Sequence, residues 1–391
     1  MEAVSPLFAV AVIAIAVATA FVLGKRFGIP SSQGRFAAID GLRGYLALFV
    51  FLHHSCIWFF YFKTGQWKVP PSNLYTHFGQ NGVAFFFMIT AFLFFSKLLD
   101  GKQKSIDWNR LFISRFFRIV PLYLFLMLLF ALVIGYISEG ILNEPLPLLI
   151  NKACYWLGFT FFGNPNLNGL NNTFTIVAGV TWSLPYELFF YISLPMLALT
   201  VGLVPPLPYI ALSIACMTWL LASWHPESYH LKAFLGGIVA SLLVRSDSFC
   251  QIAASKVASM IAIASVTLVI NLYPLAYTDV PLLLLSLAFA IFADGNSLFG
   301  VLTSGASRVL GEMAYSIYLL HGIFLFITFI FIIGIPSSQA LLPMAHWSVI
   351  IGITPILIIL SFLTFRWIER PMMQCTAVVN DWIRSRQVKP S

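Results

Sequence analysis

The sequence has very little charge for its length. Only 9% of its 391 residues are Asp, Glu, Lys or Arg, whereas 60% are hydrophobic; a soluble domain typically carries about 25% charged residues. Such a chain cannot cover its surface with polar groups, so we expect an integral membrane protein. The net charge of +8 is too diluted to indicate nucleic-acid binding, and it suits basic loops held against an anionic bilayer surface.

Paired cysteine motifs are missing as well. The five cysteines are Cys56, Cys154, Cys216, Cys250 and Cys375, and none of them forms a CxxC spacing. Most fall in apolar runs, where cysteine packs as a small hydrophobic residue. We therefore expect neither a disulfide framework nor a zinc site, and no bound metal.

What the sequence has in abundance is apolar segments, and a helix crosses a bilayer with about 20 such residues. The candidate segments are residues 7–23, 36–61, 78–99, 113–137, 146–162, 182–204, 207–223, 231–244, 257–273, 282–292, 313–333 and 347–367. No long polar linker separates them, so we expect one all-α, polytopic membrane bundle. Residues 1–30 would form an additional N-terminal helix with a basic loop, residues 35–372 the main membrane domain, and residues 373–391 a cytoplasmic basic tail.

Lys and Arg residues predict the orientation, because short cytoplasmic loops are enriched in both. Basic residues gather in three places. Lys25, Arg26 and Arg35 follow the first segment, a second group lies between Lys97 and Arg118, and Arg366, Arg370 and Lys389 lie at and after the end of the last segment. These charges follow the first segment, which favours a retained helix over a cleaved signal peptide. We expect an N-terminus outside and a C-terminus in the cytoplasm. That requires an odd number of crossings, about eleven if residues 146–162 or 231–244 do not span.

Ionisable side chains within apolar helices are costly and therefore indicate functional sites. Eleven residues separate Arg43 from His54, so one helix would place them about 16 Å apart on one face, with His53 turned about 100° away. Glu187 lies in an apolar stretch and needs a proton, a cation or hydrogen-bond donors. The residues also allow ordinary roles: Arg43 as an interfacial charge, and His54 and His321 as packing or interhelical hydrogen-bond partners.

Arg115 and Arg118 are spaced i, i+3 at the predicted inner end of a helix. Both guanidinium groups would then face one way, which suits a bidentate grip on phosphate. A basic collar that only sets the membrane orientation explains the same spacing.

Six blocks in order resemble the motifs of the acyltransferase-3 family. They are Asp40-Gly-Leu-Arg43 with His54 eleven residues after the arginine, Gly82–Phe92, Arg115-Phe-Phe-Arg118, Trp182-Ser-Leu-Pro-Tyr-Glu187, Leu310–His321 and Glu369-Arg-Pro371. Ala84 stands where the second block usually has aspartate, and Thr90-Ala91 replaces a Ser-Gly pair. The resemblance spans Phe36 to Pro371 and implies ten core helices plus the N-terminal one.

The resemblance implies transfer of an acyl group, commonly acetyl, from cytoplasmic acyl-CoA to a hydroxyl of a cell-surface polysaccharide, O-antigen or lipid-linked glycan. His54 would be the general base, with Glu187 and Arg43 also catalytic, and Arg115 and Arg118 would hold the acyl-CoA phosphates. The residues expected to bind substrate are Arg115, Arg118, Trp182, Ser183, Tyr191, Tyr318 and His321. Glu187 would pair with His54 or Arg43, and residues 164–172, rich in asparagine, would offer hydrogen bonds to a sugar.

The same resemblance predicts a bacterial inner-membrane location, and a separate periplasmic protein for any second step. A proton-coupled transporter or flippase is the main alternative, with His54, Glu187 and His321 as a proton relay. A second alternative is a non-catalytic membrane scaffold, which would tolerate apolar replacements of His54 and Glu187.

Overall fold

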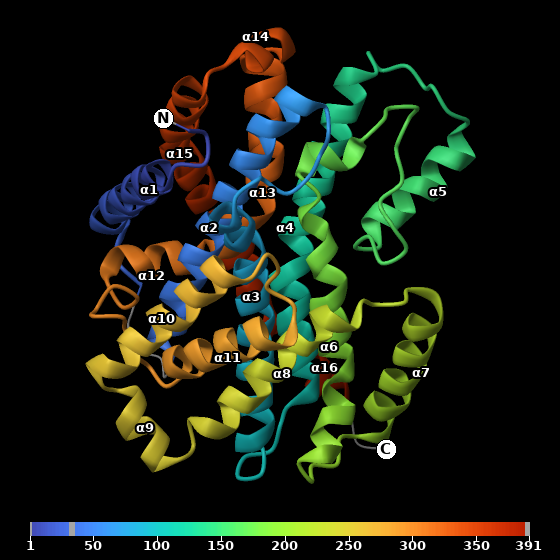
Figure 1. Ribbon diagram of the computed structural model, residues 1–391. Helices are drawn as coiled ribbons and strands as arrows, with labels where there is room; N and C mark the ends of the chain where they lie inside the picture. Colours follow the sequence, from blue (N-terminus) through green and yellow to red (C-terminus); the bar gives the residue numbers. More distant parts are fainter. Residues whose placement is uncertain (1, 31–35, 388–391) are drawn as a thin grey trace. The chain divides into compact units, whose positions relative to one another are not determined.

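The computed structural model describes residues 2–30 and 36–387. In that part of the chain every regular element is a helix, as Figure 1 shows, so the prediction of an all-α fold is confirmed. Arg35 and Lys389, two of the basic residues used for the orientation, lie outside the described residues.

Two compact units divide the chain. The first unit contains residues 1–96 and 226–361, and the second contains residues 97–225 and 362–391. Each unit is therefore assembled from segments that are far apart in the sequence, and each has its own packing and its own candidate site residues.

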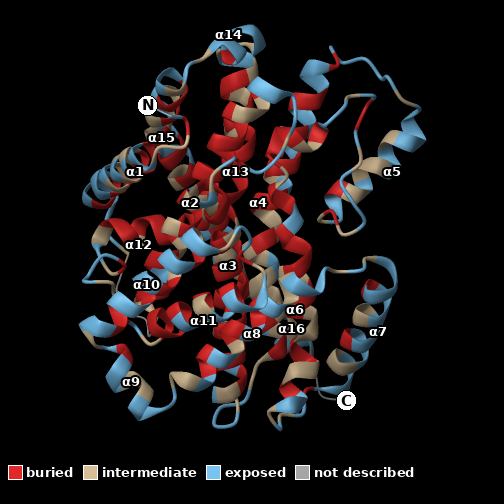
Figure 2. Ribbon diagram, in the orientation of Figure 1, coloured by how far each residue is buried: buried red, intermediate tan, exposed pale blue. Residues whose placement is uncertain are grey.

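The first unit contains most of the helices. They are α1 (Pro6–Phe27), α2 (Ala37–Thr64), α3 (Asn73–Asp100, whose last turn passes into the second unit), α8 (Ser228–Leu243), α9 (Asp247–Ala253), α10 (Lys256–Leu272), α11 (Asp279–Ala293), α12 (Gly305–Glu312), α13 (Ala314–Phe326) with a π-helical continuation (Ile327–Ile332), α14 (Ile335–Ala340) and α15 (Pro343–Thr364). Helix α2 contacts α11, α12, α13 and α14. Figure 2 shows α2 and α3 as largely buried, which places the helix that carries His54 in the packed interior of this unit.

Glycines on both helices allow α2 and α12 to cross closely. A Cβ atom on Gly44 would lie 2.7 Å from the Leu310 carbonyl carbon, and one on Gly311 would lie 2.0 Å from the Asp40 carbonyl oxygen. No side chain fits at such distances, so small residues allow the two backbones to touch, as is common between membrane helices. The crossing holds the N-terminal end of α2 against α12.

The second unit is built on α4 (Trp108–Ile137). Its other elements are α5 (Leu146–Leu157), two 3-10 turns (Thr173–Val177 and Val180–Ser183), α6 (Leu184–Thr200), α7 (Leu207–Ser223), a π-helical turn (Phe365–Glu369) and α16 (Arg370–Gln387). Helix α6 packs on α7, and α16 packs on α4. The expected basic tail is thus helical as far as Gln387, and Asp107, the N-cap of α4, accepts hydrogen bonds from Asn380 and Arg384 of α16.

Six helices among the described residues are long and apolar enough to cross a membrane, and the pair α8 and α9, bent by 107°, would add a seventh. Helix α5 has 12 residues and extends for only about 18 Å, too short for a bilayer. Helices α7, α10 and α11 are apolar but shorter than the six. The structure therefore confirms a polytopic bundle, while the number of eleven spans stays a prediction.

Candidate active site

Two histidines from distant parts of the sequence meet inside the first unit. His54 lies in the second half of α2 and His321 in α13, and His54 Nδ1 is 3.0 Å from His321 Nε2. Their side chains are buried, with residue exposures of 8% and 0%. The sequence motif that ends in His321 and the motif that contains His54 therefore form one site.

The hydrogen bonds of this pair assign the tautomer of each ring. His321 Nδ1 is 3.0 Å from the Ile317 carbonyl oxygen, and His54 Nδ1 is 3.0 Å from the Val50 carbonyl oxygen. A carbonyl oxygen only accepts, so each Nδ1 must carry the proton, and in a neutral imidazole the other nitrogen is then an acceptor. His321 Nε2 accepts from His54 Nδ1–H, which leaves Nε2 of His54 as the basic nitrogen of the pair.

Aromatic rings surround this pair. Trp67, in the loop between α2 and α3, stacks over His54 with ring centroids 6.4 Å apart, and Trp58 lies edge-on to Trp67 at 5.2 Å. The ring centroid of Tyr318, one of the expected substrate-binding residues, lies 6.2 Å from that of His321. Trp58 Nε1 is buried and has no hydrogen-bond partner within residues 2–30 and 36–387. The site thus places a strong N–H donor within one helical turn of His54.

His53 has a structural role in the same helix. Its Nδ1 donates to the Tyr75 carbonyl oxygen of α3 at 2.7 Å, and a Cβ atom on Gly79 would lie 2.6 Å from its ring. The ring therefore fills the contact between α2 and α3. His53 and His54 therefore contact different neighbours, as expected for successive residues about 100° apart on a helix.

Arg43 lies near the start of α2, and its guanidinium is 3.7 Å from the Asp40 carboxylate. Because α2 continues without a break from Ala37 to Thr64, Arg43 and His54 are about 16 Å apart along the axis. The structure confirms one continuous helix for the two residues and does not bring them into contact.

In the second unit, Glu187 lies in the first turn of α6, where Pro185 occupies one of the first two positions. This is the placement that the sequence predicts, and a carboxylate there is favoured by the helix dipole. The Tyr191 hydroxyl donates to Glu187 Oε1, and Arg115 makes a side-chain hydrogen bond with Tyr191. Tyr191 thereby links three of the expected site residues. The pairing of Glu187 with His54 or Arg43, which belong to the first unit, stays a prediction.

Arg118 lies one turn after Arg115 in α4. Its Nη1 donates to the Met373 sulfur of α16 at 3.4 Å, whereas its buried Nη2 has no hydrogen-bond partner among the residues that the structure describes. A thioether is a weak acceptor, and a buried guanidinium nitrogen without a partner is energetically unfavourable. Arg118 is therefore suited to an anionic ligand.

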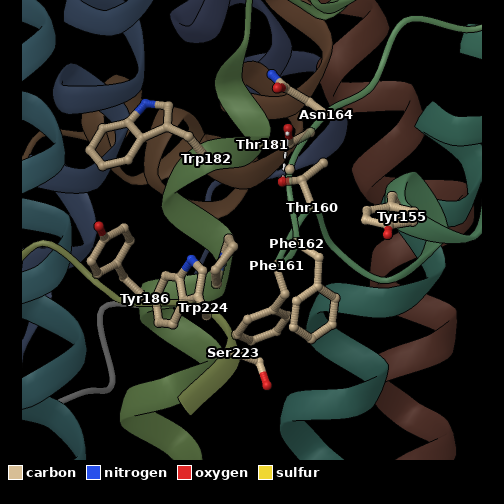
Figure 3. A pocket seen from close by; sticks show the side chains of 12 residues that line it. Tyr155, Thr160, Phe161, Phe162, Asn164, Thr181, Trp182, Tyr186, Ser223 and Trp224 are labelled. Atoms are coloured by element: carbon tan, nitrogen blue, oxygen red, sulfur yellow. Dashed lines mark hydrogen bonds between the residues drawn. The ribbon is translucent and has the colours of Figure 1, made fainter. Parts of the chain in front are cut away.

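A pocket of about 650 Å³ lies in the second unit between the segment that follows α5, the start of α6 and the end of α7 (Figure 3). Its aromatic residues are Tyr155, Phe161, Phe162, Trp182, Tyr186 and Trp224. Its polar residues are Thr160, Asn164, Thr181 and Ser223. Of the expected substrate-binding residues, Trp182 lines this pocket, whereas Ser183, the N-cap of α6, is buried and does not line it.

Sequence reasoning missed most of this pocket. Tyr186 could have been identified because it lies within the Trp182–Glu187 block, but Trp224 and Phe161 belong to no motif. Trp67 and Trp58 beside His54 were missed for the same reason. Within residues 2–30 and 36–387, no group of three His, Cys, Asp or Glu side chains is arranged as metal ligands.

Comparison with known proteins adds one match. A family model described as an acyltransferase domain matches residues 36–366, which include His54, the Arg115–Arg118 pair, Glu187 and His321. No curated protein and no solved structure gives a significant match. Since the matched stretch covers most of the chain and coincides with the motifs, the protein belongs to the acyltransferase-3 family and is an integral membrane acyltransferase.

Proposed function

We propose that this protein is an O-acetyltransferase that moves the acetyl group of cytoplasmic acetyl-CoA, or the acyl group of a related acyl-CoA, to a hydroxyl of a cell-surface polysaccharide, O-antigen or lipid-linked glycan. The observation that carries the proposal is the His54–His321 pair. A hydroxyl is a poor nucleophile and needs a positioned base, and the pair supplies one basic nitrogen, His54 Nε2, with the opposite nitrogen occupied by hydrogen bonds.

In the proposed reaction, His54 Nε2 accepts the proton of the acceptor hydroxyl while the hydroxyl oxygen attacks the thioester carbonyl carbon. The new C–O bond replaces the C–S bond, and the coenzyme A thiolate leaves and takes the proton from His54. His321 steadies the ring by accepting from Nδ1–H, and it stabilises the imidazolium that forms after the first proton transfer. Direct attack of this kind needs no acyl-enzyme.

The donor site proposed here is centred on Arg118 and Arg115. Coenzyme A carries several phosphate charges, and Arg118 has a buried N–H group without a partner in the described residues. Arginine is well suited to phosphate because its planar fork can donate two parallel hydrogen bonds. With the basic segment Lys97–Arg118 in the cytoplasm of a bacterial inner membrane, the donor would enter from that side.

The proposal is tested with radiolabelled acetyl-CoA in membranes that contain the protein together with the host's surface glycans. We expect alkali-labile label on glycan from the wild type, and mass spectrometry of surface glycans with and without the gene should show a matching acetyl difference. Absence of both signals would refute the proposal.

A Glu187→Gln variant separates acyl transfer from the transporter alternative. If Glu187 supports the charged state of the base, the variant keeps its fold and donor binding and loses most turnover. In a proton-coupled transporter the same change would abolish the response to a pH gradient, and acetyl-CoA would be irrelevant. Full acyl transfer by Glu187→Gln would reject its catalytic role.

A further inference from the structure

We propose that the pocket of the second unit binds a saccharide ring of the acceptor. The assignment of this saccharide as the acyl acceptor depends on the proposed function, whereas saccharide binding itself does not. A volume of about 650 Å³ falls within the roughly 300–1,000 Å³ typical of small-molecule sites, and the whole lining comes from one unit, between Tyr155 and Trp224.

The lining has the two kinds of group that a sugar needs. A pyranose ring presents C–H faces and an edge of hydroxyls, so it pairs with aromatic faces and with hydrogen-bonding side chains. Tyr186 and Trp224 pack together with ring centroids 4.7 Å apart, and Trp224 also contacts Phe161 at 5.2 Å. Figure 3 shows Thr160, Thr181 and Asn164 grouped at one end of the pocket and the rings of Trp224, Phe161 and Phe162 at the other.

The asparagine-rich loop supplies one side chain to the pocket and keeps others for its own structure. Asn166 accepts from Thr173, and Asn168 joins the backbone of Asn143 and Ile141. Asn164 instead lines the pocket and forms no side-chain hydrogen bond with any residue that the structure describes. Its amide is therefore available to a ligand as both donor and acceptor.

A second polar group is fixed at the pocket wall. The Thr160 hydroxyl donates to the Thr181 oxygen at 3.4 Å, and both threonines are buried. Since Thr181 accepts this bond, its own hydroxyl hydrogen is left to donate elsewhere. The lining thus offers a hydroxyl donor at Thr181 and an amide at Asn164, both of which can hydrogen-bond to sugar hydroxyls.

The pocket lies far from the basic segment Lys97–Arg118 of the second unit. Tyr209, in the first turn of α7, donates to Asn109 in the first turn of α4, so the start of α7 lies beside the basic segment. Ser223 at the end of α7 is then about 20 Å away along the helix axis. If the basic segment is cytoplasmic, the acceptor is engaged from the outer half of the membrane.

Exposed aromatic side chains lie at the pocket. Phe162, which lines it, and Trp219 are 41% and 56% exposed, and their rings pack edge-to-face at 5.1 Å. The pocket would hold the same sugar ring whether the saccharide is free or attached to a lipid carrier. A free saccharide would reach it from water, and a lipid-linked one from the bilayer.

The test measures saccharide binding without acyl-CoA. The full chain in lipid nanodiscs is mixed with methyl glycosides of glucose, N-acetylglucosamine and rhamnose, or with the same sugars linked through diphosphate to a polyprenyl lipid, and contact is read by saturation-transfer NMR. We expect at least one sugar to bind the wild type. Asn164→Ala should weaken that binding about three- to tenfold, the loss for one or two hydrogen bonds, and Trp182→Ala should weaken it as well.

Asn171→Ala is the matched control, because Asn171 is exposed on the same loop and does not line the pocket. Binding of free glycosides supports a soluble acceptor, and binding of the lipid-linked sugars alone supports a lipid-linked acceptor. Equal binding by the Asn164→Ala and Asn171→Ala variants, or no binding from either source, would overturn the assignment of the pocket. Saccharide binding in a protein that transfers no label from acetyl-CoA would instead refute the proposed function and leave the pocket assignment in place.

Discussion

Two sets of polar site residues, one in each unit, are held in opposite ways. In the first unit, His53, His54 and His321 are buried and each ring has a backbone carbonyl partner. In the second unit, Arg118 keeps a buried nitrogen without a partner in the described chain, and Asn164 lines an open pocket without a side-chain hydrogen bond to the described residues. If His54 is the base, the first arrangement orients its ring before substrate arrives, whereas the second leaves hydrogen-bonding capacity for ligands.

We expect substitutions in these two sets of residues to have different kinetic effects. A base that is already oriented reduces the reorganisation needed at the moment of reaction, so its loss should lower kcat. A side chain whose hydrogen bonds are completed only by a ligand should contribute mainly to binding, so its loss should raise KM. Substitutions in each unit test that division.

His54→Ala should lower acyl transfer by about two to four orders of magnitude, the range for removing a general base. The measurement is label transfer from acetyl-CoA at equal amounts of folded protein. His53→Ala is the matched control, since His53 bridges α2 and α3 through Tyr75, and we expect a milder loss that follows reduced stability. Equal kinetic losses in the two variants would contradict the assignment of His54 as the base.

His321→Ala should lower kcat about 10- to 100-fold, as when a partner that orients a catalytic imidazole is removed, with little change in KM for acyl-CoA. Without His321 Nε2, His54 Nδ1–H keeps only its bond to the Val50 carbonyl oxygen. His321→Gln should recover part of the rate, because an amide oxygen can accept the same hydrogen bond. No recovery, or a change confined to KM, would show that His321 does not act by positioning His54.

Arg118→Ala should raise KM for acyl-CoA about tenfold and leave kcat nearly normal, because a charge-assisted hydrogen bond contributes roughly 1.5–3 kcal/mol. Arg110→Ala is the control, an exposed arginine two turns earlier in α4. A collapsed kcat with unchanged KM would move Arg118 into the transition state and break the proposed division between the units.

Asp107→Ala should lower stability by about 1 kcal/mol, the usual value of a helix N-cap, with no direct effect on turnover. Burial alone would raise the pKa of the Asp107 carboxyl, but hydrogen bonds from the Arg110 backbone, Asn380 and Arg384 outweigh it and lower the pKa. Because the folded-state pKa is depressed, this stabilisation is present above the unfolded pKa of about 4 and is lost as pH falls through the folded value.

The measurement is thermal unfolding in detergent near pH 7 and at acid pH, with Asp381→Ala in α16 as the control. We expect the difference in Tm between Asp107→Ala and the wild type to shrink at the lower pH. A Tm difference that stays constant down to acid pH would show that the Asp107 carboxylate is not what joins α4 to α16.

The family motifs in the sequence are sufficient to name most of the candidate catalytic residues. The sequence predicts one helix over residues 36–61, and α2 runs from Ala37 to Thr64; this continuity follows from a local apolar run. The choice of His54 over His53 as the base stays a prediction. The i, i+3 spacing of Arg115 and Arg118 does not predict their hydrogen-bond partners, because Tyr191 and Met373 come from the distant helices α6 and α16.

The membrane class, the helical fold and the family follow from the amino-acid sequence alone, because hydrophobicity, charge and short motifs are local properties. Only the folded chain shows that His321 is a partner of His54, that Tyr191 links Glu187 to Arg115, and that residues between Tyr155 and Trp224 line one pocket. Residues 54 and 321 are 267 positions apart, and their contact depends on which helix faces pack together. No spacing within a single segment encodes that choice.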